Sequence, residues 1–162
     1  MRDYARMAHE KFKSGYNCAQ AVACTFAEEL NMQEEDVARM VSCFGGGMGK
    51  LREVCGAVSG SLFVIGSLKG YSDPTAVQEK ADLYARVQDF AARFRAEHDT
   101  VVCRELLKNL ALKNEHTSVP DARTDEYYRV RPCVRFVESA ARIVGEMLND
   151  PTLWNDNGGS GT

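Results

Sequence analysis

The residues of this 162-residue chain with the clearest chemical potential are its six cysteines: Cys18, Cys24, Cys43, Cys55, Cys103 and Cys133. No two of them form the C-x-x-C pair on which thioredoxin motifs, zinc ribbons and bacterial ferredoxin runs depend. A reducing compartment keeps thiols free, so this many cysteines indicates metal binding or redox chemistry rather than structural disulfides. Any site made from these residues must therefore be assembled by the fold.

Four of the cysteines coincide with predicted helix starts, and we call them the helix-start cysteines: Cys18, Cys55, Cys103 and Cys133. The first follows the candidate N-cap Asn17, the third follows the cap at 99–100, and the last follows Pro132. Cys55 is expected in the first turn of an apolar helix. A helix start presents unpaired N–H groups and partial positive charge, which favours thiolate over thiol. If the four starts converge, they would stabilise a thiolate cluster or a metal centre of net negative charge. Cys24 and Cys43 fall inside predicted helices and are expected to be core residues.

The apolar segment from Val54 to Leu68 contains no charged residue, and its length predicts a helix buried on all sides. Small residues spaced four apart on this helix would let neighbouring backbones approach closely and leave room beside Cys55. The glycine-rich connection at 45–49 is expected to be irregular and could turn its N–H groups toward an anion or sulfide. The candidate cofactor-binding glycines are Gly47, Gly49, Gly56 and Gly60.

Apolar residues at three- and four-residue spacing predict further helices around this segment. Their expected ranges are 2–14, 18–30, 34–43, 72–94, 101–112 and 133–148, with a polar surface loop at 113–124. No strand alternation, internal repeat or long linker is evident. The chain is therefore predicted to be all-α, a single-domain helical bundle over 1–150 with a disordered tail at 151–162.

The composition excludes several classes of partner. The hydrophobic content of 44% suits a globular core, and a net charge of -3 gives no reason to expect nucleic acid. No stretch reaches the roughly 18 apolar residues of a membrane span, so no membrane insertion is expected. The polar, charged residues 1–14 do not resemble a secretory signal, which predicts a cytoplasmic protein. The histidines His9, His98 and His116 show no ligand spacing and are expected to be solvated surface residues.

Three blocks of the chain resemble a known family: G-Y-N-C-A-Q-A-V at 15–22, C-F-G-G-G-M-G at 43–49 and V-C-G-A-V-S-G at 54–60. The chain is similar over about residues 4–148 to the C_GCAxxG_C_C family of redox proteins, which is named for four cysteines, one of them inside a C-G-A-x-x-G motif. Similar domains occur fused to haem-bearing electron-transfer chains, which implies a redox partner protein.

The resemblance implies that the four family cysteines are the helix-start cysteines. Cys55 is the one inside the motif, which Gly56, Ala57 and Gly60 complete. Cys18 matches the first family cysteine, and the two later ones match by order and spacing.

Three functions remain open at this point. The first is electron transfer or redox sensing at a metal centre on the four cysteines, where an iron–sulfur cluster suits the ligand set. Zinc on the same ligands would be structural, and its usual close cysteine pair is missing. The second is a thiol–disulfide oxidoreductase or peroxidase-like enzyme that uses the cysteines without metal. The third is an interaction module with structural thiols. A homodimer is compatible with all three.

Overall fold

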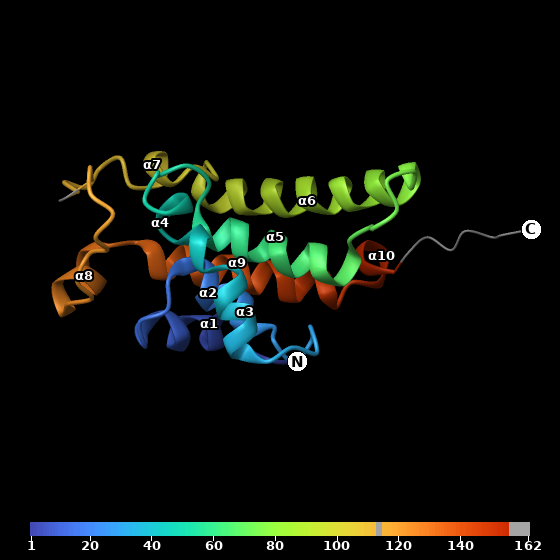
Figure 1. Cartoon of the computed structure of the whole chain (residues 1–162), viewed down its shortest axis with the longest axis horizontal. Coiled ribbons are helices and arrows are strands. Elements are labelled where there is room, and N and C mark those ends of the chain that lie inside the picture. Colours follow the sequence, from blue (N-terminus) through green and yellow to red (C-terminus); the bar gives the residue numbers. More distant parts are fainter. Residues whose placement is uncertain (113–114, 156–162) are drawn as a thin grey trace, which may run out of the picture.

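The computed structural model describes residues 1–112 and 115–155, and this part of the chain is all-α, without a β-strand (Figure 1). The predicted fold class, a single-domain helical bundle, is confirmed. The helices are α1 (Tyr4–Lys13), α2 (Cys18–Thr25), α3 (Glu34–Met40), the 3-10 turn η1 (Ser42–Phe44), α4 (Gly45–Met48), α5 (Gly56–Lys69), α6 (Val77–His98), α7 (Cys103–Leu106), α8 (Asp125–Val130), α9 (Cys133–Leu148) and α10 (Pro151–Trp154). In the described residues no helix has both the length and the apolarity needed to cross a membrane.

Helix α5 lies at the centre, with α2 and α9 packed against it and α6 running along its other side (Figure 1). Its first half, from Gly56 to Ser61, is completely enclosed, whereas in its second half Leu62 and Phe63 are only partly buried. The prediction of burial on all sides is therefore right for the first half and wrong for the second. The two halves differ in their neighbours: the backbone of α2 crosses the first half at Gly60, whereas a Cβ on Gly66 in the second half would have no atom within 4 Å.

The closest approach to α5 occurs at Gly60. A Cβ atom on this residue would lie 2.6 Å from the carbonyl oxygen of Ala19 in α2, closer than real Cβ contacts. Glycine is therefore required at this crossing for a steric reason. The predicted small-residue face of the helix has the packing function expected of it.

Several helix boundaries differ from the prediction. Helix α6 begins at Val77 and not near Pro74, because the Asp73 carboxylate accepts bonds from Thr75 N–H and Oγ1 (2.9 and 2.7 Å) and closes a separate turn. Helix α2 ends at Thr25 rather than residue 30, and the helix predicted over 101–112 is reduced to the single turn of α7. The prediction of one long core element there is wrong.

Two short helices were not predicted, and each begins at a side-chain cap. Thr124 accepts a hydrogen bond from Tyr127 N–H at the start of α8, and Asp150 accepts one from Thr152 N–H at the start of α10. The predicted disordered tail therefore begins with a helical turn, while residues 156–162 lie outside the described part of the chain.

Two predictions about single residues are corrected. Cys24 is buried as expected, but Cys43 lies exposed in η1, because α3 ends before reaching it. His98 is not a solvated residue: its side chain is 14% exposed, lies between the rings of Phe94 and Phe136, and is 2.9 Å from Ser139 Oγ.

Candidate functional site

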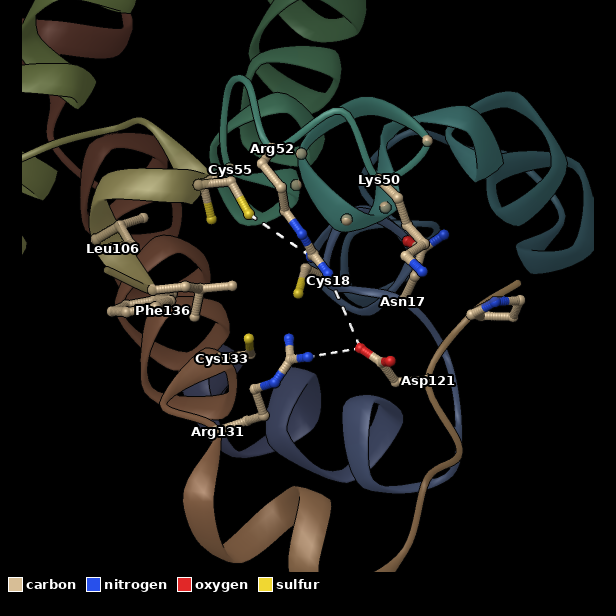
Figure 2. Close-up of a pocket in the computed structure, with 18 of the residues that line it drawn as sticks. Asn17, Cys18, Lys50, Arg52, Cys55, Leu106, Asp121, Arg131, Cys133 and Phe136 are labelled. Carbon is tan, nitrogen blue, oxygen red and sulfur yellow. Dashed lines mark hydrogen bonds and ion pairs between the residues drawn. The ribbon is translucent and has the colours of Figure 1, made fainter. Parts of the chain in front are cut away.

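The four helix-start cysteines line one pocket of about 390 Å³. Figure 2 shows Cys18, Cys55 and Cys133 around it, with Arg52, Arg131 and other side chains on its wall. Elements far apart in sequence contribute to the lining, including α2, the glycine turn, the start of α5, α7, the segment before α8 and the start of α9. Cys24 and Cys43 do not line it.

Each of these cysteines stands at the start of a helix. Cys18 is the first residue of α2, where the Asn17 side chain accepts from Gln20 N–H and the Gln20 side chain accepts from Asn17 N–H. Cys103 is the first residue of α7 and Cys133 the first of α9. Cys55 is the N-cap of α5 and not a first-turn residue, a correction of one position.

Backbone pairing between two distant segments brings Cys55 and Cys103 to the same wall. Val54 and Val102 form an isolated antiparallel bridge. On either side of it, Cys55 N–H donates to Val101 O (2.8 Å) and Cys103 N–H donates to the carbonyl of Glu53 (2.6 Å). These two cysteines are 48 positions apart in sequence, and no local pattern indicates this pairing.

The glycine connection is a left-handed turn. Five successive residues, 46–50, have φ between 59° and 69°, and two of them, Met48 and Lys50, are not glycine. Left-handed backbone costs roughly 1–2 kcal/mol per non-glycine residue, so the fold holds this segment in a strained conformation. The turn leads directly into Arg52, which also has positive φ (58°) and enters the pocket.

Three of the four candidate glycines line the pocket: Gly47, Gly49 and Gly56. A Cβ on Gly47 would lie 2.6 Å from the Cβ of Cys103, and one on Gly56 would lie 3.1 Å from the Cβ of Cys18. Both glycines therefore let a cysteine approach the backbone closely. Gly60 does not line the pocket and belongs to the α2–α5 crossing described above.

The pocket wall also carries charged residues that the sequence analysis did not identify. Arg52 donates through Nε and Nη2 to the Glu115 carboxylate (2.7 Å each), and its Nη1 is 4.0 Å from Cys103 Sγ. Arg131 Nη2 donates to Asp121 (2.5 Å), which is also 3.8 Å from Arg52 Nη2. Both arginines precede a helix-start cysteine by two or three positions, and this proximity is the one sequence signal that could have indicated them.

A third arginine, Arg123, adds positive charge to the pocket wall, and its hydrogen-bond partners are neutral. Arg123 donates to the carbonyl oxygens of Phe12 (3.1 Å) and Tyr16 (2.8 Å), and its guanidinium lies 5.0 Å from the Tyr127 ring centroid. Within the described residues no carboxylate is among its hydrogen-bond partners. The pocket wall thus carries more positive than negative charge near the sulfurs if the thiols are neutral.

The Cys18 and Cys133 thiols are hydrogen-bonded to each other, and this bond separates their pKa values. It raises the pKa of Cys18 well above the ordinary value, with burial acting in the same direction. The same bond lowers the pKa of Cys133 to about 7 against the effect of burial, and the Arg131 guanidinium lowers it further. The pair is thus arranged with Cys18 as the donor and Cys133 as the thiolate.

The other two pocket thiols favour the neutral form. Burial raises the pKa of Cys55 to about 12, although the N–H groups of Ala57 and Val58 at the start of α5 oppose it. Burial also raises the pKa of Cys103, against the nearby charge of Arg52. The start of α5 therefore favours the Cys55 thiolate, as expected, but burial outweighs this effect, just as it outweighs the charge of Arg52 at Cys103.

In the metal-free chain, the pH at which each pocket cysteine becomes reactive should follow its pKa, lower for Cys133 than for Cys55. The alkylation of Cys133 by iodoacetamide should rise with pH to a half-maximal rate near pH 7, because the reactive thiolate forms there. Cys55 should need a pH several units higher to react. Mass spectrometry of digested samples, labelled briefly between pH 5 and 10, gives each rate separately. A midpoint for Cys133 above pH 9 would contradict the assigned pair.

The spacing of the donors limits what the pocket can hold. Among the described residues, no three His, Cys, Asp or Glu side chains are close enough together to share a single metal ion. The four sulfurs are instead distributed around the pocket wall.

Comparison with known proteins gives one match. The sequence model of a family described as "Putative redox-active protein (C_GCAxxG_C_C)" matches residues 16–147, which include all four helix-start cysteines. No curated protein and no solved structure matches the chain.

Proposed function

Because the chain belongs to the C_GCAxxG_C_C family of redox-active proteins, we propose that its four helix-start cysteines hold an iron–sulfur cluster that transfers electrons. The observation that carries this proposal is the convergence of four thiols, from four different helix starts, on one pocket. Four cysteine thiolates are the usual ligands of two-iron and four-iron clusters. When bound, such a cluster supplies one-electron transfer.

The charge of the pocket wall supports an anionic group at this position. Four thiolates bring more negative charge than the net positive charge of a cluster's core of iron and bridging sulfide, so the cluster site as a whole is an anion. Arg52, Arg123 and Arg131 lie on the wall, and among the described residues Arg52 and Arg131 have carboxylate partners whereas Arg123 donates to carbonyl oxygens. Their positive charge would compensate part of the negative charge of the ligands.

The spacing of the thiols favours a cluster over a single zinc ion. At a Zn–S distance of about 2.3 Å, tetrahedral ligation requires sulfurs about 3.8 Å apart. The described chain contains no group of three His, Cys, Asp or Glu side chains placed to hold one metal ion, so a single zinc ion would require the pocket thiols to move together. A cluster with bridging sulfide spans a larger space and needs less movement of these helix starts.

The chain's own residues would orient and shield this group. Cys55 is 4% exposed, and Cys103 and Cys133 are each 7% exposed, so the pocket excludes water from most of the ligand set. The Ala57 and Val58 N–H groups face the Cys55 sulfur and would stabilise its thiolate. Gly47 and Gly56 keep the space beside Cys103 and Cys18 free of side chains.

A second function, thiol–disulfide exchange, is favoured by the contact between Cys18 and Cys133. In this reaction the Cys133 thiolate attacks a disulfide of a partner, and one partner sulfur leaves as a thiolate. Cys18 then gives up its proton and attacks the mixed disulfide, so the chain loses two electrons and one proton while the partner disulfide becomes one thiol and one thiolate. The two sulfurs are already neighbours, so this step requires little rearrangement.

One experiment separates the two functions. Protein purified without oxygen should be brown, with visible absorption and stoichiometric iron and sulfide, and with little zinc in the same sample. Colourless protein that stays free of iron after reconstitution with iron and sulfide would overturn the cluster. A thiol count before and after mild oxidation would then support exchange chemistry if Cys18 and Cys133 alone disappear as a pair.

A further inference from the structure

One arginine of the pocket lies between a cysteine sulfur and a carboxylate. Arg52 presents Nη1 to the Cys103 sulfur at 4.0 Å, while Nε and Nη2 form a two-pronged pair with Glu115. The Arg52 side chain is 11% exposed and that of Glu115 is 24% exposed. Solvent therefore screens this charge only partly, and the sulfur and the carboxylate act on the same guanidinium.

A second arginine repeats the arrangement. Arg131, with a 9% exposed side chain, acts electrostatically on the Cys133 sulfur and donates through Nη2 to Asp121 at 2.5 Å. Asp121 also faces Arg52, and Figure 2 shows its carboxylate joined by dashed lines to both arginines. The two arginines and the two carboxylates thus form one connected network beside the sulfurs.

Both carboxylates belong to one segment, residues 115–124, which we call the strap. The strap contributes Ser118, Pro120, Asp121 and Arg123 to the pocket wall, and Lys50 Nζ donates to the carbonyl of Val119 at 2.7 Å. In the described chain the strap contains no helix or strand, and its contacts with Arg52, Arg131 and Lys50 are hydrogen bonds and ion pairs.

We propose that Glu115 and Asp121 are positioning residues that set the redox equilibrium of the cysteine site through Arg52 and Arg131, and that the strap loosens when the site is reduced. The inference rests on the proposed redox function but does not depend on whether a cluster or a disulfide is reduced. Reduction places more negative charge on the sulfurs, which then compete with the carboxylates for the same two guanidinium groups. Because coupling between two equilibria is reciprocal, a docked strap disfavours reduction and reduction disfavours the docked strap.

The electron balance is defined for either centre. One-electron reduction of a cluster adds one unit of negative charge to the ligand set. Reduction of a Cys18–Cys133 disulfide by two molecules of glutathione breaks the S–S bond and yields one molecule of glutathione disulfide. The protein takes two electrons and keeps one proton, on Cys18, so that at pH 8 Cys133 is left as a thiolate beside Arg131 and the second proton is released to solvent. In both cases the arginines face more negative charge after the reaction than before it.

The test uses the full chain with Glu115→Gln and Asp121→Asn combined. The matched control combines Glu146→Gln and Asp89→Asn, which remove carboxylates paired with Arg142 (2.8 Å) and Arg93 (3.0 Å) outside the pocket lining. Metal-free protein is equilibrated in glutathione redox buffers at pH 8. We expect the strap variant to favour the dithiol at least tenfold more than wild type, about 30 mV for two electrons. The control should stay within twofold of wild type.

Hydrogen exchange of the strap amides supplies a second readout that does not depend on activity. In wild type, the amides of 115–124 should exchange several-fold faster in reduced than in oxidised protein. In the strap variant this difference should shrink, because positions 115 and 121 no longer carry the carboxylates that compete with the sulfurs for Arg52 and Arg131. Asp121→Asn alone, which keeps the Arg52–Glu115 pair, should give a smaller shift of the same sign and serves if the double variant does not fold.

The outcomes separate this inference from the proposed cluster. Protein that contains no iron but shows the glutathione shift and the strap response would retain the inference and overturn the cluster. In brown protein the strap variant should raise the one-electron potential by about 60 mV, again a tenfold effect. Brown protein with unchanged potential and unchanged strap exchange would retain the cluster and overturn the inference.

Discussion

Replacing Cys55 with serine is expected to reduce bound iron and sulfide at least tenfold, whereas replacing Cys24 with serine should leave both unchanged. The two residues are buried to a similar extent, 4% and 2% exposed, so the substitutions carry similar folding costs. They differ in position, because Cys55 lines the pocket and Cys24 lies in α2 with its Sγ 3.7 Å from the Glu34 carbonyl. The expected difference is therefore due to ligation and not to packing.

The measurement combines iron and sulfide assays with the visible spectrum, on variants purified and reconstituted without oxygen. Chemical denaturation of the metal-free variants shows whether both have folded. Equal iron loss in the two variants, or full iron content in Cys55→Ser, would remove Cys55 from the proposed ligand set. If the protein works by thiol–disulfide exchange, Cys55→Ser should instead leave the Cys18–Cys133 reaction largely intact.

The second large effect is expected from one substitution made at two positions of the same helix, Gly60→Ala and Gly66→Ala. A Cβ on Gly60 would meet the Ala19 backbone, its oxygen at 2.6 Å and its Cα at 3.0 Å, and backbone cannot rotate away as a side chain can. A Cβ on Gly66 has nothing within 4 Å. Overpacking at Gly60 should cost about 1–3 kcal/mol, while alanine at Gly66 should stabilise α5 by up to about 1 kcal/mol.

Urea denaturation of the metal-free proteins measures both free energies of unfolding. Because Ala19 adjoins Cys18 in α2, Gly60→Ala should also displace the start of that helix and lower iron binding, whereas Gly66→Ala should not. Stability of Gly60→Ala equal to that of Gly66→Ala would mean that α2 and α5 can separate at no cost. The close crossing would then have no role in placing Cys18.

Local signals account for the parts of the site that the sequence predicts correctly. Asn17 forms the expected capping box before Cys18, and Pro132 precedes Cys133 at the start of α9. Caps act through hydrogen bonds within about three residues, so their effect is encoded in adjacent positions. The turn capped by Asp73 and the helix starts capped by Thr124 and Asp150 depend on hydrogen bonds that are equally local. These departures from the predicted boundaries therefore also have a signal in adjacent positions of the sequence.

The sequence by itself determined that helix starts carry four of the cysteines and that an apolar, small-residue helix forms the centre of the bundle. Only the tertiary structure decided that these starts meet in one pocket, through the Val54–Val102 bridge and the crossing of α2 with α5. It also selected Arg52 and Arg131, from among 20 lysines and arginines, to face the sulfurs, and it exposed Cys43. The physical reason is that a cap is a contact between neighbours in sequence. The charge and spacing of the pocket depend on contacts between segments dozens of residues apart, which no local pattern specifies.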